Sequence, residues 1–254
     1  MPTLPAHLSA AHTRGLPATS PAAPTAEAVP APRTATTDTA TGGLTSKGPI
    51  FAGTGWRITA QFRTYCLSPT QQYVITFPTQ ALKDRYVPYL TTAVNQLTAL
   101  GLNLSFGGIE TPDYNTVPPR GHIQYAEAYR PLGTAGYSQG LPCYNTADNS
   151  VWGGYVRIDS EYWDGTWSIS PVVLKNALVH ELGHALGLDH CNSDLNSDGT
   201  IASYEAVKDP STGCTPIMTS PNGGYQDSRA GQFTPYDLNG FKQLLANAPI
   251  LGVA

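Results

Sequence analysis

The 254-residue sequence has little charge, and what charge it has is not basic. Charged residues make up 13% of the chain, whereas about 25% is typical of soluble domains. The 14 Lys and Arg residues against 18 Asp and Glu give a formal net charge of −4. Without an excess of basic residues, the sequence does not predict a positively charged surface that would attract nucleic acid or an anionic membrane. We therefore expect no nucleic-acid partner.

Long apolar runs and cysteines are also scarce. No run reaches the ~18 apolar residues that a membrane-spanning helix needs, so we expect no membrane span. Four cysteines are too few to replace a hydrophobic core, although their even number suits two disulfides. Glycine and proline are abundant, with 25 and 22 residues. The composition favours a secreted, monomeric, loop-rich protein, although no clear signal peptide stands in this numbering.

The chain divides into two regions of different composition. Residues 1–47 are rich in Ala, Pro and Thr and contain no aromatic residue. Such a segment buries too little apolar surface to offset its ordering entropy, so we predict a disordered tail or linker. Residues 48–254 carry the patterns of strands and helices, and we predict that they form one domain.

Periodicity predicts an α+β fold in this second region. Alternating or continuous apolar runs predict strands at residues 56–62, 73–77, 102–106, 122–126 and 151–158. Apolar residues at helical spacing and capping signals predict helices at residues 87–100, 171–186 and from Thr234 onward. Pro88 marks the first turn of its helix or a kink. We expect a small mixed sheet with helices on both sides.

The most informative stretch contains three histidines, His180, His184 and His190. Residues four apart lie on the same face of a helix, so His180 and His184 can point at one metal ion. Gly187 allows the chain to leave the helix in a left-handed conformation, which would bring His190 round as a third ligand. Three histidines leave the fourth position of a tetrahedral Zn²⁺ open, as catalytic zinc sites do. Glu181 lies where it can reach a water at that position.

This motif resembles the zinc-binding motif of the metzincin metallopeptidases, and of the matrixins among them. The resemblance implies a metzincin-like catalytic domain with an active-site helix and a C-terminal helix. It also implies that Met218 forms the methionine turn beneath the metal, and that the strand at residues 156–158 is an exposed edge that binds substrate. No cysteine precedes Cys66, so a matrixin-type cysteine switch is not expected. Tyr225 could approach the metal, but we expect it on the surface.

A second metal-binding pattern lies between the third histidine and Met218. Residues 194–205 fit the calcium-binding loop of EF-hands at every defined position. Gly199 permits the sharp turn, and Ile201 is the expected apolar anchor. The predicted calcium ligands are side-chain oxygens and one backbone carbonyl, from Asp194, Asn196, Asp198, Thr200 (carbonyl) and Glu205. No paired helix-loop-helix is evident, so we expect a stabilising site rather than a sensor.

The four cysteines allow three pairings. Cys191 and Cys214 bracket the calcium-binding pattern, which favours a bridge between them and a second bridge between Cys66 and Cys143. Free thiols are the alternative.

Together these observations predict a secreted zinc endopeptidase that acts on a protein or peptide, with metal-activated water and Glu181 as the general base. Two alternatives remain: a non-catalytic extracellular binding module stabilised by zinc and calcium, and hydrolysis of a non-peptide amide by the same centre. The carboxylate of Glu181 argues against the binding module, because a purely structural zinc site does not need it.

Overall fold

The fold is described here from a computed structural model of the chain. The structure describes residues 2–3, 48–59 and 62–254. The predicted disordered tail therefore lies almost wholly outside the described residues. Its described part, Pro2–Thr3, forms a short strand that the sequence did not predict.

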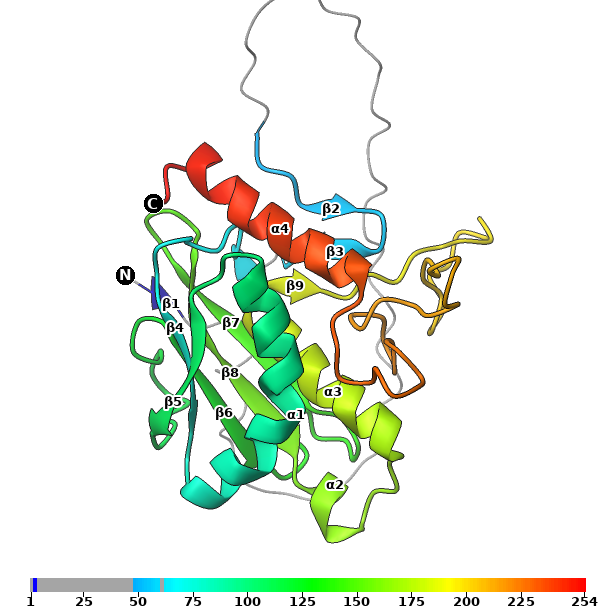
Figure 1. The fold of residues 1–254 in the computed structure, drawn as a ribbon, viewed down its shortest axis with the longest axis horizontal. Coiled ribbons are helices and arrows are strands. Elements are labelled where there is room, and N and C mark those ends of the chain that lie inside the picture. Colours follow the sequence, from blue (N-terminus) through cyan, green and yellow to red (C-terminus); the bar gives the residue numbers. More distant parts are fainter. Residues whose placement is uncertain (1, 4–47, 60–61) are drawn as a thin grey trace, which may run out of the picture.

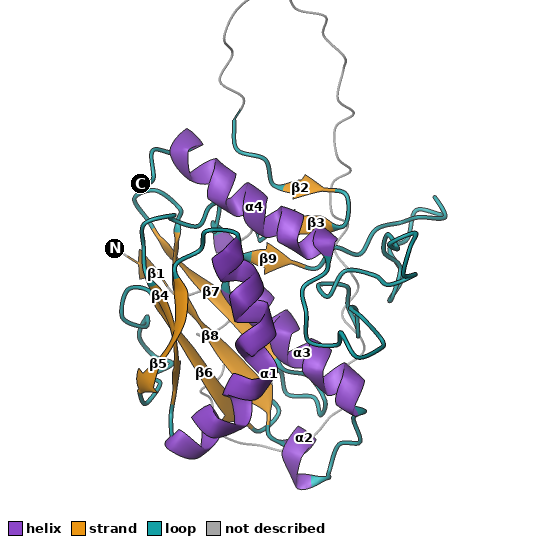
Figure 2. Cartoon of the chain, viewed as in Figure 1, coloured by secondary structure: helices purple, strands orange, loops and turns teal. Residues whose placement is uncertain are grey.

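A six-stranded mixed sheet forms one layer of the molecule (Figures 1 and 2). In spatial order its strands are β1 (Pro2–Thr3), β7 (Gln139–Asn145), β8 (Val151–Asp159), β6 (His122–Ala128), β4 (Tyr73–Phe77) and β5 (Leu104–Ile109). The last four of these run parallel, whereas β7 is antiparallel to both β8 and β1. The sheet is therefore mixed, as predicted.

Two long helices, α1 (Gln80–Ala99) and α3 (Pro171–Ala185), cover one face of this sheet. Tyr125 of β6 shows that both lie on the same side, because its ring packs against Tyr86 of α1 at 4.9 Å and its hydroxyl donates to the Leu178 carbonyl of α3. The other face is covered by the segment after β5, where the carbonyl of Asp113 accepts from the Tyr155 hydroxyl. No helix of the described ranges covers this second face, so for them the expectation of helices on both sides of the sheet is wrong.

The C-terminal helix α4 (Pro235–Ile250) lies across the end of this layer. It packs against a three-stranded sheet of β2 (Ala52–Gly53), β3 (Trp56–Ile58) and β9 (Leu188–Asp189). A short helix, α2 (Glu161–Asp164), precedes α3. None of the helices in the described ranges is long and apolar enough to span a membrane.

Local signals explain where the helices begin and end. The Thr79 hydroxyl accepts a hydrogen bond from the backbone of Leu82, so α1 begins at Gln80, earlier than predicted, and Pro88 lies inside it. The Ser170 hydroxyl caps α3 in the same way, with Pro171 in the first turn. Gly187 adopts a φ of +100°, the left-handed conformation that ends this helical segment and that glycine adopts without strain.

Candidate metal centre

Helix α3 and the turn after it bring the three predicted histidines together. Nε2 of His190 lies 3.2 Å from Nε2 of His180 and 3.1 Å from Nε2 of His184. The two helical histidines are one turn apart, and the left-handed Gly187 returns the chain through β9 to His190. Within the described residues, these three form the group of possible metal donors whose atoms all lie within 4.8 Å of one another.

Backbone carbonyls fix the orientation of the two helical rings. Nδ1 of His180 lies 2.7 Å from the Ile217 carbonyl, and Nδ1 of His184 lies 2.8 Å from the Leu188 carbonyl. A carbonyl only accepts, so each Nδ1 carries the hydrogen and each Nε2 presents a lone pair. Nε2 of His190 can carry at most one proton, so it cannot satisfy both neighbouring lone pairs by donation. A shared cation resolves this conflict.

The spacing fits zinc. Imidazole nitrogens at about 2.0–2.1 Å from a tetrahedral Zn²⁺ lie about 3.3 Å from one another, close to the distances between these Nε2 atoms. Loss of solvent lowers the pKa of His180 to about 4 and that of His184 well below its ordinary value; neighbouring histidines add to both effects. Both rings are therefore neutral at neutral pH, which is the form that binds a metal.

The carboxylate of Glu181 lies in the wall of the same cleft as the triad. Its residue is only 9% exposed, and burial raises the pKa of this carboxyl to about 8, although a hydrogen bond from the Gly140 backbone opposes the shift. No carboxylate other than Glu181 lines the cleft within the described part of the chain. It is therefore placed where a catalytic acid or base would act.

Met218 packs directly beneath α3 at the triad. A Cβ added to Gly183 would meet the Met218 sulfur at 2.5 Å, so the glycine between the two helical histidines allows this close approach. The turn is held from below by Asp237, whose carboxylate accepts from the backbone nitrogens of Ile217 (2.9 Å) and Met218 (3.2 Å). Asp237 stands three residues after Thr234, a position that predicts a helix cap but not this second role.

A cleft of about 640 Å³ extends from the triad along the N-terminal part of α3. One of its edges is β7, which the sequence did not predict. Gly140 of β7 lies against α3 so closely that an added Cβ would meet the Glu181 carbonyl oxygen at 2.1 Å. The cleft is therefore bounded by a strand on one side and by the segment after Met218, with Pro221 and Gly223, on the other.

The expected edge strand at residues 156–158 is an inner strand. It belongs to β8, which pairs with β7 on one side and with β6 on the other. Among the described residues the edge beside the metal centre is instead β7, because β1 pairs with it only at Tyr144 and Asn145. The prediction failed because sheet order depends on pairing between distant segments, which local sequence does not encode.

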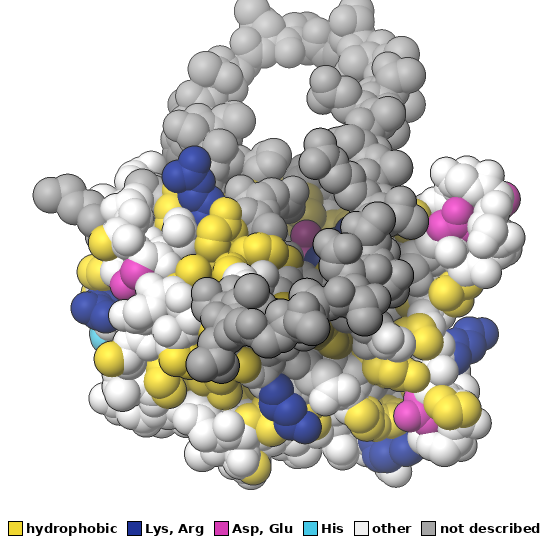
Figure 3. Space-filling view, turned by 90° about the horizontal axis from the view of Figure 1, so that it is seen from above, with side chains coloured by type: hydrophobic (Ala, Val, Ile, Leu, Met, Phe, Trp, Pro, Cys, Tyr) yellow, Lys and Arg dark blue, Asp and Glu magenta, His cyan; other side chains and the backbone are white. Residues whose placement is uncertain are grey.

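The predicted calcium ligands lie in a largely exposed loop whose acidic side chains bond to the loop backbone. In the described residues, the acidic side chains of loop 194–205 form no group of three donors within 4.8 Å. They cap the loop backbone instead: Asp194 accepts from Gly199 (2.9 Å), and Glu205 from Leu195 (2.7 Å). The loop (yellow in Figure 1) projects from the molecule, and acidic side chains mark the same projection in Figure 3. The predicted anchor Ile201 is exposed, so that role is wrong.

All four cysteines are free thiols, and neither predicted bridge is formed. The backbone of Cys66 forms a β-bridge with Ser150, just before β8. The backbone of Cys143 in β7 lies opposite Gly153, on the other side of β8. Two strand spacings of about 4.8 Å separate them, and Cα atoms more than about 7 Å apart cannot be bridged. The Cys191 sulfur instead lies 3.6 Å from the Thr219 hydroxyl oxygen.

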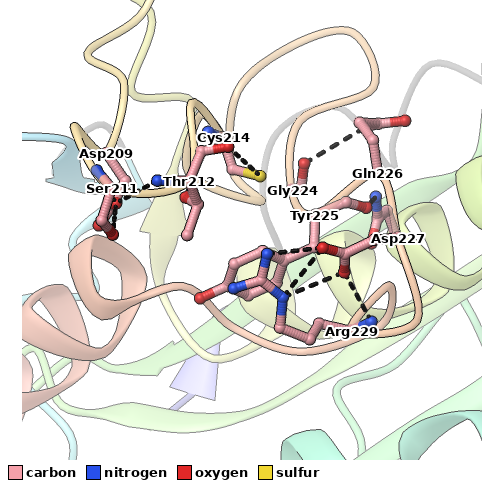
Figure 4. Close-up of polar contacts among 10 residues, drawn as sticks. Asp209, Ser211, Thr212, Cys214, Gly224, Tyr225, Gln226, Asp227 and Arg229 are labelled. Carbon is pink, nitrogen blue, oxygen red and sulfur yellow. Dashed lines mark hydrogen bonds and ion pairs between the residues drawn. The ribbon is translucent and has the colours of Figure 1, made fainter.

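Tyr225 is buried rather than on the surface, and it does not line the cleft. Figure 4 shows its ring beneath Arg229, whose guanidinium carbon lies 4.2 Å from the ring centroid. Asp227 pairs with this guanidinium at 2.6 Å. The ring thus helps to pack the loop that follows Met218.

The comparisons with known proteins leave the family open. No protein-family model and no curated protein matches the chain. A solved structure of myroilysin is similar, at 13% identity and a TM-score of 0.36, over 72% of this chain and 95% of that chain.

Proposed function

We propose that this protein is a zinc-dependent endopeptidase of metzincin, matrixin-like type. The observation that carries the proposal is the convergence of three imidazole Nε2 atoms beside the buried carboxylate of Glu181, on the wall of an open cleft. Secretion and a monomeric state belong to the same proposal and rest on composition.

The three histidines would hold the zinc. A bound Zn²⁺ polarises a carbonyl group and lowers the pKa of water to about 7. A cation held by the three histidines would favour the ionised form of Glu181 and so oppose the raised pKa that burial gives it. In that form Glu181 would accept a proton from the attacking water and deliver it to the leaving nitrogen of the peptide. The Ile217 and Leu188 carbonyls keep two imidazole rings in the orientation that points Nε2 at the cleft.

Strand β7 offers a place for the substrate backbone. In the described part of the chain, residues 139–143 pair with β8 on one side only, and β1 covers only the end of β7. An extended peptide can add to such an edge through main-chain hydrogen bonds. This would place its peptide bonds along the cleft, beside the triad and Glu181.

The proposal includes a structural calcium ion in loop 194–205, supported by the match to the EF-hand pattern. Addition of Ca²⁺ to zinc-loaded protein should raise the melting temperature, because an ion that binds only the folded state stabilises it. The Asp194→Asn variant, which lacks one ligand charge, should show a smaller rise. An unchanged melting temperature and no bound calcium in wild type would remove this part of the proposal.

The experiment that tests the proposed activity replaces Glu181 by Gln, which keeps the size of the side chain and removes its basicity. We expect casein and peptide cleavage to fall by at least about 100-fold, in the range of general-base catalysis. Zinc content and the circular dichroism spectrum should remain those of wild type.

Full activity in Glu181→Gln would contradict the role of this carboxylate. Zinc-loaded wild-type protein that cleaves neither casein nor a peptide library would favour the non-catalytic binding module instead.

A further inference from the structure

The loop between the third histidine and Met218 is tied to one wall of the cleft. The side-chain amide of Asn192 makes two hydrogen bonds with the backbone of Ser220: its nitrogen donates to the carbonyl at 2.6 Å, and its oxygen accepts from the amide at 2.8 Å. At the other end of the loop, the Tyr204 amide donates to the same Ser220 carbonyl at 3.1 Å. Ser220 begins the cleft-lining segment that includes Pro221.

Tyr204 is held in an unusual backbone conformation at this point. Its φ is +65°, in the left-handed region that residues with side chains rarely adopt. Hydrogen bonds hold the backbone on both sides of this residue. The Tyr204 amide donates to the Ser220 carbonyl, and the carbonyl of the next residue, Glu205, accepts from the Ser193 amide at 2.9 Å. Strained conformations that persist under such constraints are concentrated at ligand-binding sites.

The Tyr204 side chain has no packing role that would explain this placement. The residue is 58% exposed, yet it lines the cleft together with His190 and Ser220. The ring therefore presents an apolar face to whatever occupies the cleft. Since it contributes little to the buried core, its removal should leave folding intact.

The rest of the cleft indicates what this ring would contact. Three further exposed apolar side chains line it: Leu132, Tyr137 and Trp167. Among the described cleft-lining residues there is no lysine or arginine, and Glu181 is the one carboxylate. Exposed apolar side chains gathered at one cleft mark a binding surface, and a charged substrate side chain would find no opposite charge apart from the catalytic centre.

We infer that Tyr204 is a specificity-determining residue of the proposed peptidase, which contacts a large uncharged apolar or aromatic side chain of the peptide substrate. This inference rests on the proposed function. It assigns to loop 194–205 a direct part in substrate selection, in addition to any stabilising role.

The test compares cleavage profiles of wild type, Tyr204→Ala and Tyr204→Phe on a peptide library, followed by kcat/KM on matched peptides. Tyr204→Ala should lose about three- to tenfold in kcat/KM for a peptide with a large apolar side chain at the contacted position, as expected for one aromatic contact. A peptide with alanine there should be cut at the wild-type rate. Tyr204→Phe keeps the ring and should keep the wild-type profile.

The matched control is Ile201→Ala, in the same loop and similarly exposed at 54%, but outside the cleft lining. It should leave the profile unchanged. An active Tyr204→Ala enzyme with a wild-type cleavage profile would overturn this inference alone. The same holds if Tyr204→Phe or Ile201→Ala loses as much kcat/KM for the apolar peptide as Tyr204→Ala does. A wild-type protein that binds zinc and cleaves no peptide would overturn the proposed function and this inference together.

Discussion

At the scale of single residues, Asp237 connects the C-terminal helix to the turn at Met218. Its buried carboxylate accepts from the amides of Ile217 and Met218 and also from the amide of Thr234, where α4 begins. The position of Asp237 three residues after Thr234 could be predicted from the sequence as a helix cap. Its contact with a turn about 20 residues earlier could not, because the capping pattern is local.

We predict that Asp237→Ala destabilises the fold by about 2–4 kcal/mol, because three buried backbone amides, those of Ile217, Met218 and Thr234, lose their partner. Urea denaturation at neutral pH measures this change. Asp227→Ala serves as the control, since that carboxylate lies at the surface beside Arg229 and its loss should leave the midpoint close to wild type. Equal midpoints for the two variants would show that Asp237 does not hold the turn.

At the scale of elements, the helices of the candidate site were predictable and its edge strand was not. Helix α3 carries its own signals: a serine cap, a proline in the first turn, and histidines one turn apart. Strand β7 has a glycine and a proline and no β-branched residue, so its own sequence disfavours a strand. Its antiparallel pairing with β8 overrides that preference. Tertiary pairing of this kind is not encoded in a local window.

The close packing of β7 on α3 leads to a further prediction. Gly140→Ala should lower both activity and zinc affinity, because the added Cβ would lie 2.1 Å from the Glu181 carbonyl oxygen and 2.8 Å from the His184 Cβ. Zinc titration and a peptide assay measure these effects. The control is Gly108→Ala in β5, where an added Cβ meets nothing within 4 Å. A Gly140→Ala variant with the properties of Gly108→Ala would show that β7 does not set the geometry of the centre.

At the scale of the whole molecule, α1 and α3 cover one face of the six-stranded sheet, and α3 carries the triad beside β7. The cleft lies between β7 and the segment after Met218. The amphipathic pattern of each helix predicts that it packs on a core, but not which side of the sheet it covers. For that reason the sequence predicted the α+β class and misplaced the helices. The spacing of the histidines, by contrast, is a local pattern, and it predicted which side chains would meet.

The central claim is that three imidazoles bind one zinc ion. Metal analysis of the purified full-length chain, after equilibration with Zn²⁺ and removal of excess metal, tests it most directly. We predict one zinc per chain in wild type and substoichiometric zinc in His190→Ala, which lacks one of the three nitrogen donors. A wild-type chain that retains no zinc, or a His190→Ala variant that retains it as tightly as wild type, would contradict the account.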